Sequence, residues 1–436
     1  MNDNKTSKNS IVAKFAVPIS FLILFFLAAN FTDCDLVTFW KRRNHLTDLV
    51  VDMIPPDFSY IQKILLPLFY TIQMSVTGTV LGTFFALVLS PFGAANLGFP
   101  AVIRRILRIV IQILRSFPAL ILALTATFLF GLGTFAITLY TFAIMTKLTY
   151  EDASAADVKA YQALRAMGVS KYVAYIHGIL PEIIPGFLTN ALYLLETNVR
   201  HSSILGYVGA GGIGLLLNEK ISWLEYDKVG TILLMLFLTV CVIEYFSRYL
   251  AALIRKERTI KKEQARLLLL FLAALFLICT FTLSLPDFSR TSPQTLRNMF
   301  AGFLQPDWSF FFSAEKDGLG YLLLETVCIA FIGTVIGAIV SAPLAFLNTK
   351  RFVPAPVSFL FNLVIMVIRS VPFLVYGLIF IRVSGPGAFT GVLTLAVCSI
   401  GLLTKRFTEA LDALDPRPYH ALLAMGVRPL PAICHS

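Results

Sequence analysis

The chain has 436 residues, of which 57% are hydrophobic and 14% are charged, and its formal net charge is +11. Soluble domains average about 25% charged residues, so this composition excludes an ordinary soluble protein and indicates a polytopic membrane protein. The basic residues stand in short clusters at the ends of apolar runs, most densely between 255 and 266. That distribution is typical of cytoplasmic loops, so we expect no nucleic-acid partner.

Ten apolar runs are candidate spans, since a helix needs about 20 mostly apolar residues to cross the hydrocarbon core. In chain order they are 15–31, 65–90, 109–130, 134–148, 183–199, 228–252, 266–285, 319–345, 355–382 and 386–404. With a cytoplasmic N-terminus, alternation places the basic clusters inside, except for Lys41, Arg42 and Arg43. The first run lacks a small-x-small cleavage site, which favours a spanning helix over a signal peptide. The sequence therefore predicts an all-α integral membrane protein with about 10 transmembrane helices in the bacterial cytoplasmic membrane.

Residue types that carry catalysis or bind metals are poorly represented. The six cysteines form no Cys-x-x-Cys pair, and the five histidines fit no zinc motif. The chain also lacks the Gly-x-x-x-x-Gly-Lys-Ser/Thr loop that holds ATP phosphates. We therefore expect no catalytic residues, no metal and no cofactor, and any energy from ATP would come from another chain.

Internal repetition is the strongest feature of the sequence. SVTGTVLG (75–82) recurs as AFIGTVIG (330–337), LRSFP (114–118) as IRSVP (368–372), and YQALRAMGV (161–169) as YHALLAMGV (419–427), with offsets of 255, 254 and 258. Both copies begin on the cytoplasmic side, so the repeats are parallel. We expect a first membrane module over 1–258 with about six spans and a second over 259–436 with about four.

The repeated segment 149–182 is a polar loop between apolar runs. Tyr161 to Met167 contains good helix formers, Gly168 breaks the helix, and Leu180-Pro181 begins the next span. Periodicity alone would fit an ordinary interfacial elbow. Recurrence at the same place in the second half favours a rigid knob with a function.

The loop resembles the cytoplasmic "EAA" loop of ABC importer permeases. The matching residues are Gln162, Ala163, Leu164, Gly168, Gly178, Leu180 and Pro181, with glutamine in place of the usual glutamate and leucine in place of the second alanine. Together with LLETNVRHSSILGYVGAGGIG (194–214), the loop resembles the permease subunit of phosphonate importers. The resemblance covers about 55–252 and 319–427.

This resemblance implies partners and a coupling site. In such importers the loop docks into an ABC ATPase subunit dimer, and a separate extracytoplasmic substrate-binding protein delivers the substrate. The residues implied in ATPase coupling are Gln162, Ala163, Gly168, Leu180 and Pro181, with Ala421 and Gly426 in the second copy. The lipid bilayer is the remaining partner.

The stretch VGAGGIG fits the spacing of a dinucleotide-binding turn, but no βαβ unit is predicted around it. The alternatives are a tight packing turn or a part of the substrate pathway. Glu196 and Arg200 can pair one helical turn apart, and a charge in an apolar region is a functional candidate. The candidate pathway residues are Arg115, Arg369, Glu196, Asn198, Arg200, Gly209, Gly211, Gly212 and Gly214. For both Arg115 and Arg369, snorkelling to the cytoplasmic interface is the alternative to binding an anion.

The second copy departs from the family pattern because it stops ten residues after Gly426. The first copy lacks about four residues near 134–148, which leaves a short span. Four interpretations follow: a phosphonate permease, a phosphate or phosphite permease, an ATP-independent secondary transporter, and a nonfunctional truncated permease. Whether a second permease chain completes the missing half is left open.

Overall fold

A computed structural model describes residues 18–33, 36–130, 133–206, 209, 211–255, 262–282, 307–313, 318–349, 353–414 and 417–426, with a few isolated positions between 294 and 315. Helices account for the regular structure of these residues, and no strand occurs among them, as the predicted all-α class requires. Two compact units are present, one of residues 52–305 and one of 1–51 with 306–436.

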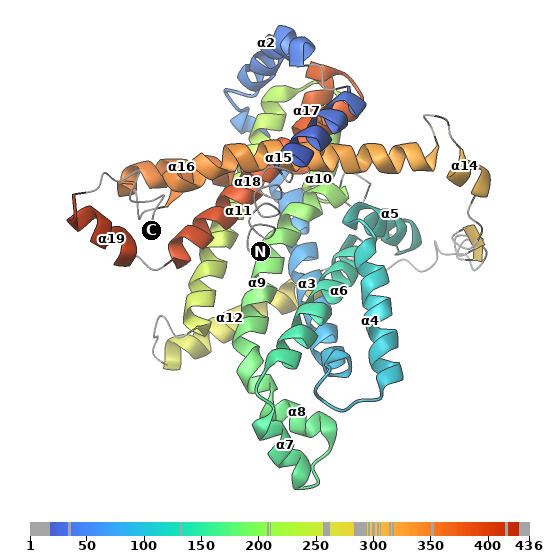
Figure 1. Cartoon of the computed structure of the whole chain (residues 1–436), viewed down its shortest axis with the longest axis vertical. Coiled ribbons are helices and arrows are strands. Elements are labelled where there is room, and N and C mark those ends of the chain that lie inside the picture. The colour runs from blue at the N-terminus through green and yellow to red at the C-terminus, as the bar shows by residue number, and fades with distance from the viewer. Residues whose placement is uncertain are drawn as a thin grey trace, which may run out of the picture. The chain divides into compact units, whose positions relative to one another are not determined.

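The unit 52–305 is built around the long helix α3 (Ile61–Gly93), which packs against α6 (Gly133–Ala155) and α9 (Leu180–Leu205). The other helices are η1 (Phe58–Tyr60), α4 (Ala101–Ser116), α5 (Ala119–Phe130), α7 (Lys159–Ala166), α8 (Lys171–Gly178), α10 (Ile213–Ser222), α11 (Tyr226–Ile254) and α12 (Lys262–Phe281). In Figure 1, α7 and α8 project together beyond the end of α9. The predicted polar loop is thus a helical projection.

The unit of 1–51 with 306–436 centres on α15 (Leu319–Asn348) and α18 (Ala388–Ala413). It also contains the helix Pro18–Phe31, α2 (Leu36–Asp52), α14 (Trp308–Phe312), α16 (Ala355–Ser370), α17 (Phe373–Ser384) and α19 (Arg417–Ala424). Ala28 of the first apolar run packs with Ile332, Phe389 and Val392 in one buried cluster. One unit therefore combines residues from both ends of the chain. The expectation of two modules, 1–258 and 259–436, remains a prediction.

The repeated Arg-Ser-x-Pro motif bends the chain. α4 and α5 meet at 90°, and α16 and α17 meet at 85°. Phe117 and Val371, which precede the two prolines, are extended with ψ of 126° and 125°. A proline ring disfavours helical backbone at the residue before it, so each helix ends there. The candidate spans 109–130 and 355–382 therefore each contain a bent pair of helices.

The repeated Gly-x-x-x-Gly glycines lie at a close helix crossing in each unit. A Cβ on Gly82 of α3 would lie 2.7 Å from both Thr138 O and Thr141 Cβ of α6. The equivalent Gly337 of α15 meets Ala396 O and Ser399 Cβ of α18. Thr138 and Ala396 stand 258 positions apart, as do Thr141 and Ser399. Both units thus build this crossing from equivalent residues.

The helix at the predicted short span, α6, extends beyond the apolar run. α6 has 23 residues because the helix continues from the apolar run into the polar segment. α5 and α17 align with an offset of 254, whereas the residues that α6 and α18 present to the glycines align with 258. At the offset of 258 the two helices end together, at Ala155 and Ala413, but α6 begins three residues later than α18, so the missing residues shorten α6 at its start.

Among the described residues, four helices are long and apolar enough to span a membrane, and three bent pairs bring the total to as many as seven. These are η1 with α3, then α11, α15 and α18, and the pairs α4 with α5, α8 with α9, and α16 with α17. The count of about 10 remains a prediction.

Candidate functional site: an exposed helical knob and a polar column

The α7–α8 knob, residues 157–178, has the predicted form of a short helix, a glycine turn and a second short helix. Gly168 adopts φ +85°, and its N–H donates to Arg165 O at 3.1 Å while Val169 N donates to Leu164 O at 3.2 Å. This pattern is the left-handed termination that favours glycine after a helix. Ser170 then caps α8, because its hydroxyl accepts from Val173 N.

The base of the knob is rigidly attached to the helices below it. The Tyr161 hydroxyl donates to Leu97 O at 2.6 Å, and burial raises the pKa of this phenol. Tyr161 packs in a cluster with Ala153, Ala174, Tyr175 and Ile179. The base of the knob is therefore close-packed against the helices below it, and such interiors deform little.

Gly178 holds the two knob helices together, a role that sequence reasoning missed. A Cβ there would lie 2.8 Å from Tyr161 N, so only glycine lets α8 cross α7 this closely. The available signal was its place two residues before Leu180-Pro181 in the segment that resembles the EAA loop.

The tip of the knob faces outward. Gln162, Ala163 and Gly168 are exposed, and Met167 exposes 78% of its surface. In the second copy Met425 is also 78% exposed, and Gly426 repeats the left-handed backbone with φ +83°. Ala421 is exposed as well. Both copies therefore present an exposed Met-Gly turn of the same backbone form.

Leu180 and Pro181 begin α9, as predicted, and Leu180 is half-buried while Pro181 is exposed. The chain turns by 70° between α8 and α9. Proline fits the first turn of a helix because the N–H it lacks has no partner there in any case.

A column of polar side chains joins α9 to α3 and α6. The Asn198 amide donates to Thr79 Oγ1 and to Thr141 Oγ1, both at 2.8 Å, and all three side chains are buried. About one helical turn from Asn198 along α9, the Ser75 and Ser202 hydroxyls bond at 2.6 Å. Asn198 therefore holds three helices in register, and its amide N–H groups face protein.

Glu196 and Arg200 form the predicted ion pair, with Oε1 and Nη2 2.6 Å apart. Their side chains are 5% and 15% exposed. A charge in this environment is costly unless it is paired, so Glu196 compensates the guanidinium. Arg200 remains the more exposed member of the pair.

The glycine segment forms the turn between α9 and α10. Gly209, Gly211 and Gly212 have φ of +89°, +86° and +76°. A Cβ on Gly214 would overlap the carbonyl oxygen of Ser203, so the start of α10 lies directly on the end of α9. Thr71 of α3 anchors the turn by accepting from Ile213 N at 2.9 Å. No strand precedes this segment among the described residues, so the βαβ unit that a dinucleotide-binding turn requires is missing there.

The two repeated arginines differ in surroundings. Arg115 is exposed in the last turn of α4, whereas Arg369 is half-buried in the last turn of α16. The aliphatic stem of Arg369 packs on Gly401, where a Cβ would lie 2.9 Å from Arg369 Cγ. The two arginines belong to different units of the chain.

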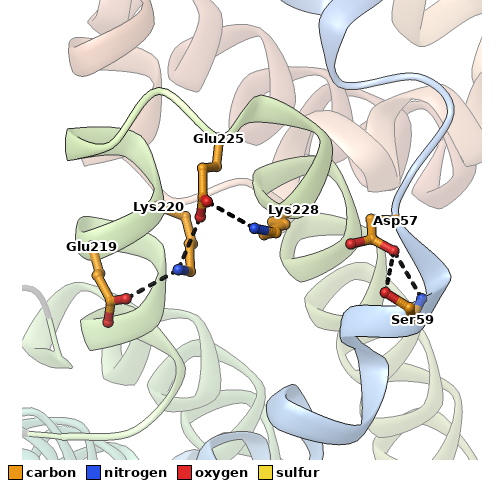
Figure 2. A network of polar contacts seen from close by, with 6 residues as sticks. All are labelled: Asp57, Ser59, Glu219, Lys220, Glu225 and Lys228. Carbon is orange, nitrogen blue, oxygen red and sulfur yellow. Dashed lines mark hydrogen bonds and ion pairs between the residues drawn. The ribbon is translucent and has the colours of Figure 1, made fainter.

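A charge cluster between α10 and α11 was missed by sequence reasoning (Figure 2). Lys220 Nζ lies 3.0 Å from Glu219 and 2.9 Å from Glu225, and Glu225 also pairs with Lys228 at 2.7 Å. The ammonium stands 4.2 Å from the Trp223 ring centroid. Burial alone lowers the pKa of Lys220, but the bonds to Glu225 and Glu219 outweigh it and raise the pKa to about 12. The cluster holds the turn between α10 and α11. The sequence feature that could have indicated it is the close spacing of glutamate and lysine between 219 and 228.

No group of three metal-ligating side chains occurs within the part of the chain that the structure describes. The candidate site has two features, both in the unit 52–305: an exposed knob on a rigid base, and a polar column with one partly exposed arginine.

Comparison with known proteins places these features in context. Residues 78–259 match the model of the family "Binding-protein-dependent transport system inner membrane component". The phosphate-import permease protein PhnE of Mycolicibacterium smegmatis is 25% identical over 88% of this chain and 73% of its own length. The phosphite transport system permease protein PtxC of Stutzerimonas stutzeri is 30% identical over 49% of this chain and 79% of its own length. A solved structure of the MetNI methionine ABC transporter aligns with 45% of this chain and 99% of its own, at 20% identity and a TM-score of 0.41, a likeness too slight to add to these matches.

Proposed function

Because the chain belongs to the family of binding-protein-dependent transport system inner membrane components, we propose that it moves phosphonate or a related tetrahedral phosphorus oxyanion across the cytoplasmic membrane. The protein is a multi-pass transport subunit rather than an enzyme. The proposal on substrate is supported by two relatives that are named for phosphate and phosphite. These anions share a tetrahedral phosphorus centre with negatively charged oxygens.

The observation that carries the proposal is the exposed Met-Gly turn on a rigid base. A separate ATPase dimer would bind the knob at Gln162, Ala163, Met167 and Gly168, whose surfaces are open. Closure of that dimer would press on the tip, and the Tyr161 contact and the packing of Gly178 would pass the movement to α9. Ala421 and Gly426 would play the same part in the second copy.

The substrate would pass along α9 in this proposal. Arg200 offers a planar guanidinium that suits a phosphorus oxyanion, because its N–H groups bond two oxygens at once. Glu196 holds the guanidinium in place at 2.6 Å, while Asn198 keeps the helix in register. Gly209, Gly211, Gly212 and Gly214 would shape the outer turn, where a substrate-binding protein would deliver its ligand. Arg115 and Arg369 remain candidate contacts.

We test coupling by co-expressing the chain with an ABC ATPase and a binding protein and measuring phosphonate-stimulated ATP hydrolysis. Gly168→Asp should abolish stimulation by charging the tip, since an added Cβ meets nothing within 4 Å and the strain of a side chain at φ +85° is matched in the control variant. Gly385→Asp is the matched control, because Gly385 has φ +84°, has equally open surroundings and lies on the loop between α17 and α18. Equal stimulation in both variants would refute the coupling role of the knob.

A further inference from the structure

One side of α4 carries basic and polar side chains along most of its length. Four of them stand at intervals of three and four residues and form the α4 stripe: Arg105, Arg108, Gln112 and Arg115. This spacing places them on one face of the helix. All are exposed except Arg108, which is half-buried and whose Nε donates to Gly93 O at 3.0 Å. Within the part of the chain that the structure describes, no carboxylate forms an ion pair with these arginines.

The face of α4 that suits lipid lies elsewhere on the helix. Ile106, Val110 and Ile113 are 56%, 44% and 52% exposed. Ile113 precedes Arg115 by two residues, which turn a helix by about 200°, so the two side chains point to nearly opposite sides. The helix therefore offers one exposed apolar face and a separate exposed polar one.

Arg115 lies deeper than the start of α4. The helix begins beside the knob, since Lys171 of α8 donates to Gly98 O just before it, and in Figure 1 it extends from that end of the unit toward α5. Arg115 follows Arg105 by ten residues, or about 15 Å, which is half of a hydrocarbon core of about 30 Å. A guanidinium that far into lipid is costly, so its charge requires water or an anion.

The deep end of the stripe leads toward Arg200. Arg115 lies near enough to Tyr140 of α6 to interact with it electrostatically. The Tyr140 ring meets His201 of α9 edge-on, with ring centroids 5.4 Å apart, and His201 adjoins Arg200. Polar side chains therefore continue from α4 across α6 to the ion pair of α9.

The second copy lacks most of the stripe. At the offset of 254, three of the four counterparts are uncharged: Phe359, Asn362 and Met366. Arg115 alone keeps an arginine counterpart, Arg369. The bend after the helix is nevertheless 85° in the second copy and 90° in the first. The fold that the two copies share therefore does not require the stripe.

We propose that the α4 stripe binds the transported phosphorus oxyanion on its way between Arg200 and the cytoplasmic side. Each guanidinium can bond two oxygens at once, and a row of positive charges without carboxylate partners attracts an anion. This inference rests on the proposed function for the identity of the anion and for the cytoplasmic position of the knob. Phospholipid headgroups carry the same phosphate chemistry, so the test separates the two sources.

The test measures thiol labelling of the full chain in nanodiscs, whose two membrane faces are open to the reagent. The native cysteines are replaced by alanine, one cysteine is introduced at a time, and the probe is an anionic methanethiosulfonate. Arg115→Cys and Gln112→Cys should react roughly tenfold faster than Ile113→Cys, because only the thiolate reacts and apolar surroundings suppress it. Ile113 is the matched control, since it lies at nearly the same depth on the apolar face.

Two further measurements probe anion binding at Gln112→Cys. Methylphosphonate or phosphite at twice its dissociation constant should slow labelling roughly threefold, relative to sodium chloride of equal ionic strength, because the site is then free one third of the time. Adding Arg115→Gln should slow the anionic reagent about threefold, the effect of one unit charge about 7 Å away in water. Arg115→Lys keeps the charge and should leave the rate unchanged.

Several results would overturn the inference. Labelling of Arg115→Cys and Gln112→Cys at the rate of Ile113→Cys would show that lipid or protein covers the stripe. Fast labelling without protection by either anion would show a wet surface that binds neither. Protection that appears only in phosphatidylcholine nanodiscs and is lost when phosphatidylglycerol is added would identify lipid headgroups as the preferred ligand. Uptake of methylphosphonate by the chain with its ATPase and binding protein separates the failures: uptake without protection overturns this inference alone, whereas no uptake overturns the proposed function as well.

Discussion

Gly82 offers the sharpest perturbation of the fold, because its backbone lies against α6 without room for a side chain. In Gly82→Ala the new Cβ would lie 2.7 Å from Thr138 O and Thr141 Cβ, and 2.9 Å from Phe142 N. Two of these atoms belong to the backbone and cannot rotate away. The helices must separate by about 0.7 Å to restore ordinary contact at 3.4 Å.

The magnitude follows from two opposing effects. Overpacking a tight interior costs about 1–3 kcal/mol. Replacing glycine by alanine inside a helix stabilises the helix by about 1 kcal/mol at most. Since the clash involves backbone atoms, we place its cost at the upper end and expect Gly82→Ala to lower the free energy of unfolding by about 1–2 kcal/mol.

The assay is unfolding in mixed micelles of mild detergent and SDS, followed by circular dichroism. Gly186→Ala in α9 is the control, because only Asp152 Oδ2 stands near its added Cβ, at 4.0 Å. That variant should be neutral or slightly more stable. If Gly82→Ala were as stable as Gly186→Ala, the close crossing of α3 and α6 would not limit stability and the reasoning would fail.

Two further predictions use the same unfolding assay. Asn198→Leu removes two interhelical bonds of 2.8 Å and should cost about 1–3 kcal/mol, since each such bond in a membrane protein contributes about 0.6–1.7 kcal/mol; Thr197→Val, which removes a bond to Tyr193 O within α9, should cost less than half as much. In the charge cluster between α10 and α11, hydrogen bonds from Lys228 and Lys220 lower the pKa of Glu225. The stabilisation of the fold by Glu225 is therefore fully present above its ordinary pKa and is lost as pH falls through the lowered value. Lys220→Met should flatten the decline in stability on acidification, and an unchanged pH profile would show that the cluster is not coupled to folding.

The sequence predicted much of the fold because its signals are local or repeated. Apolar run length located most of the helices, and the recurring glycine and Arg-Ser-x-Pro motifs marked a crossing and a bend that both units share. The bend within 109–130 was missed because the hydropathy of a run does not show whether the helix axis changes direction along it. Only the conformational effect of Pro118 on Phe117 converts the run into two helices.

The candidate site was predicted residue by residue but not in its arrangement. The spacing of Glu196 and Arg200 was enough to predict their ion pair, since both lie on one helix. The partners of Asn198 lie on α3 and α6, more than 50 residues away in the sequence, so periodicity along α9 could not reveal them. Lys220 was overlooked for a related reason, because its ammonium also lies 5.5 Å from the ring centroid of Tyr60, a residue far away in the sequence.

The most direct test of the central claim is uptake of radiolabelled methylphosphonate into membrane vesicles that contain the chain with an ABC ATPase and a binding protein. We predict accumulation that requires ATP, persists when proton and sodium gradients are collapsed, and is lowered by excess unlabelled phosphite. Accumulation that continues without ATP and disappears with the ion gradients would contradict the account and identify a secondary transporter instead.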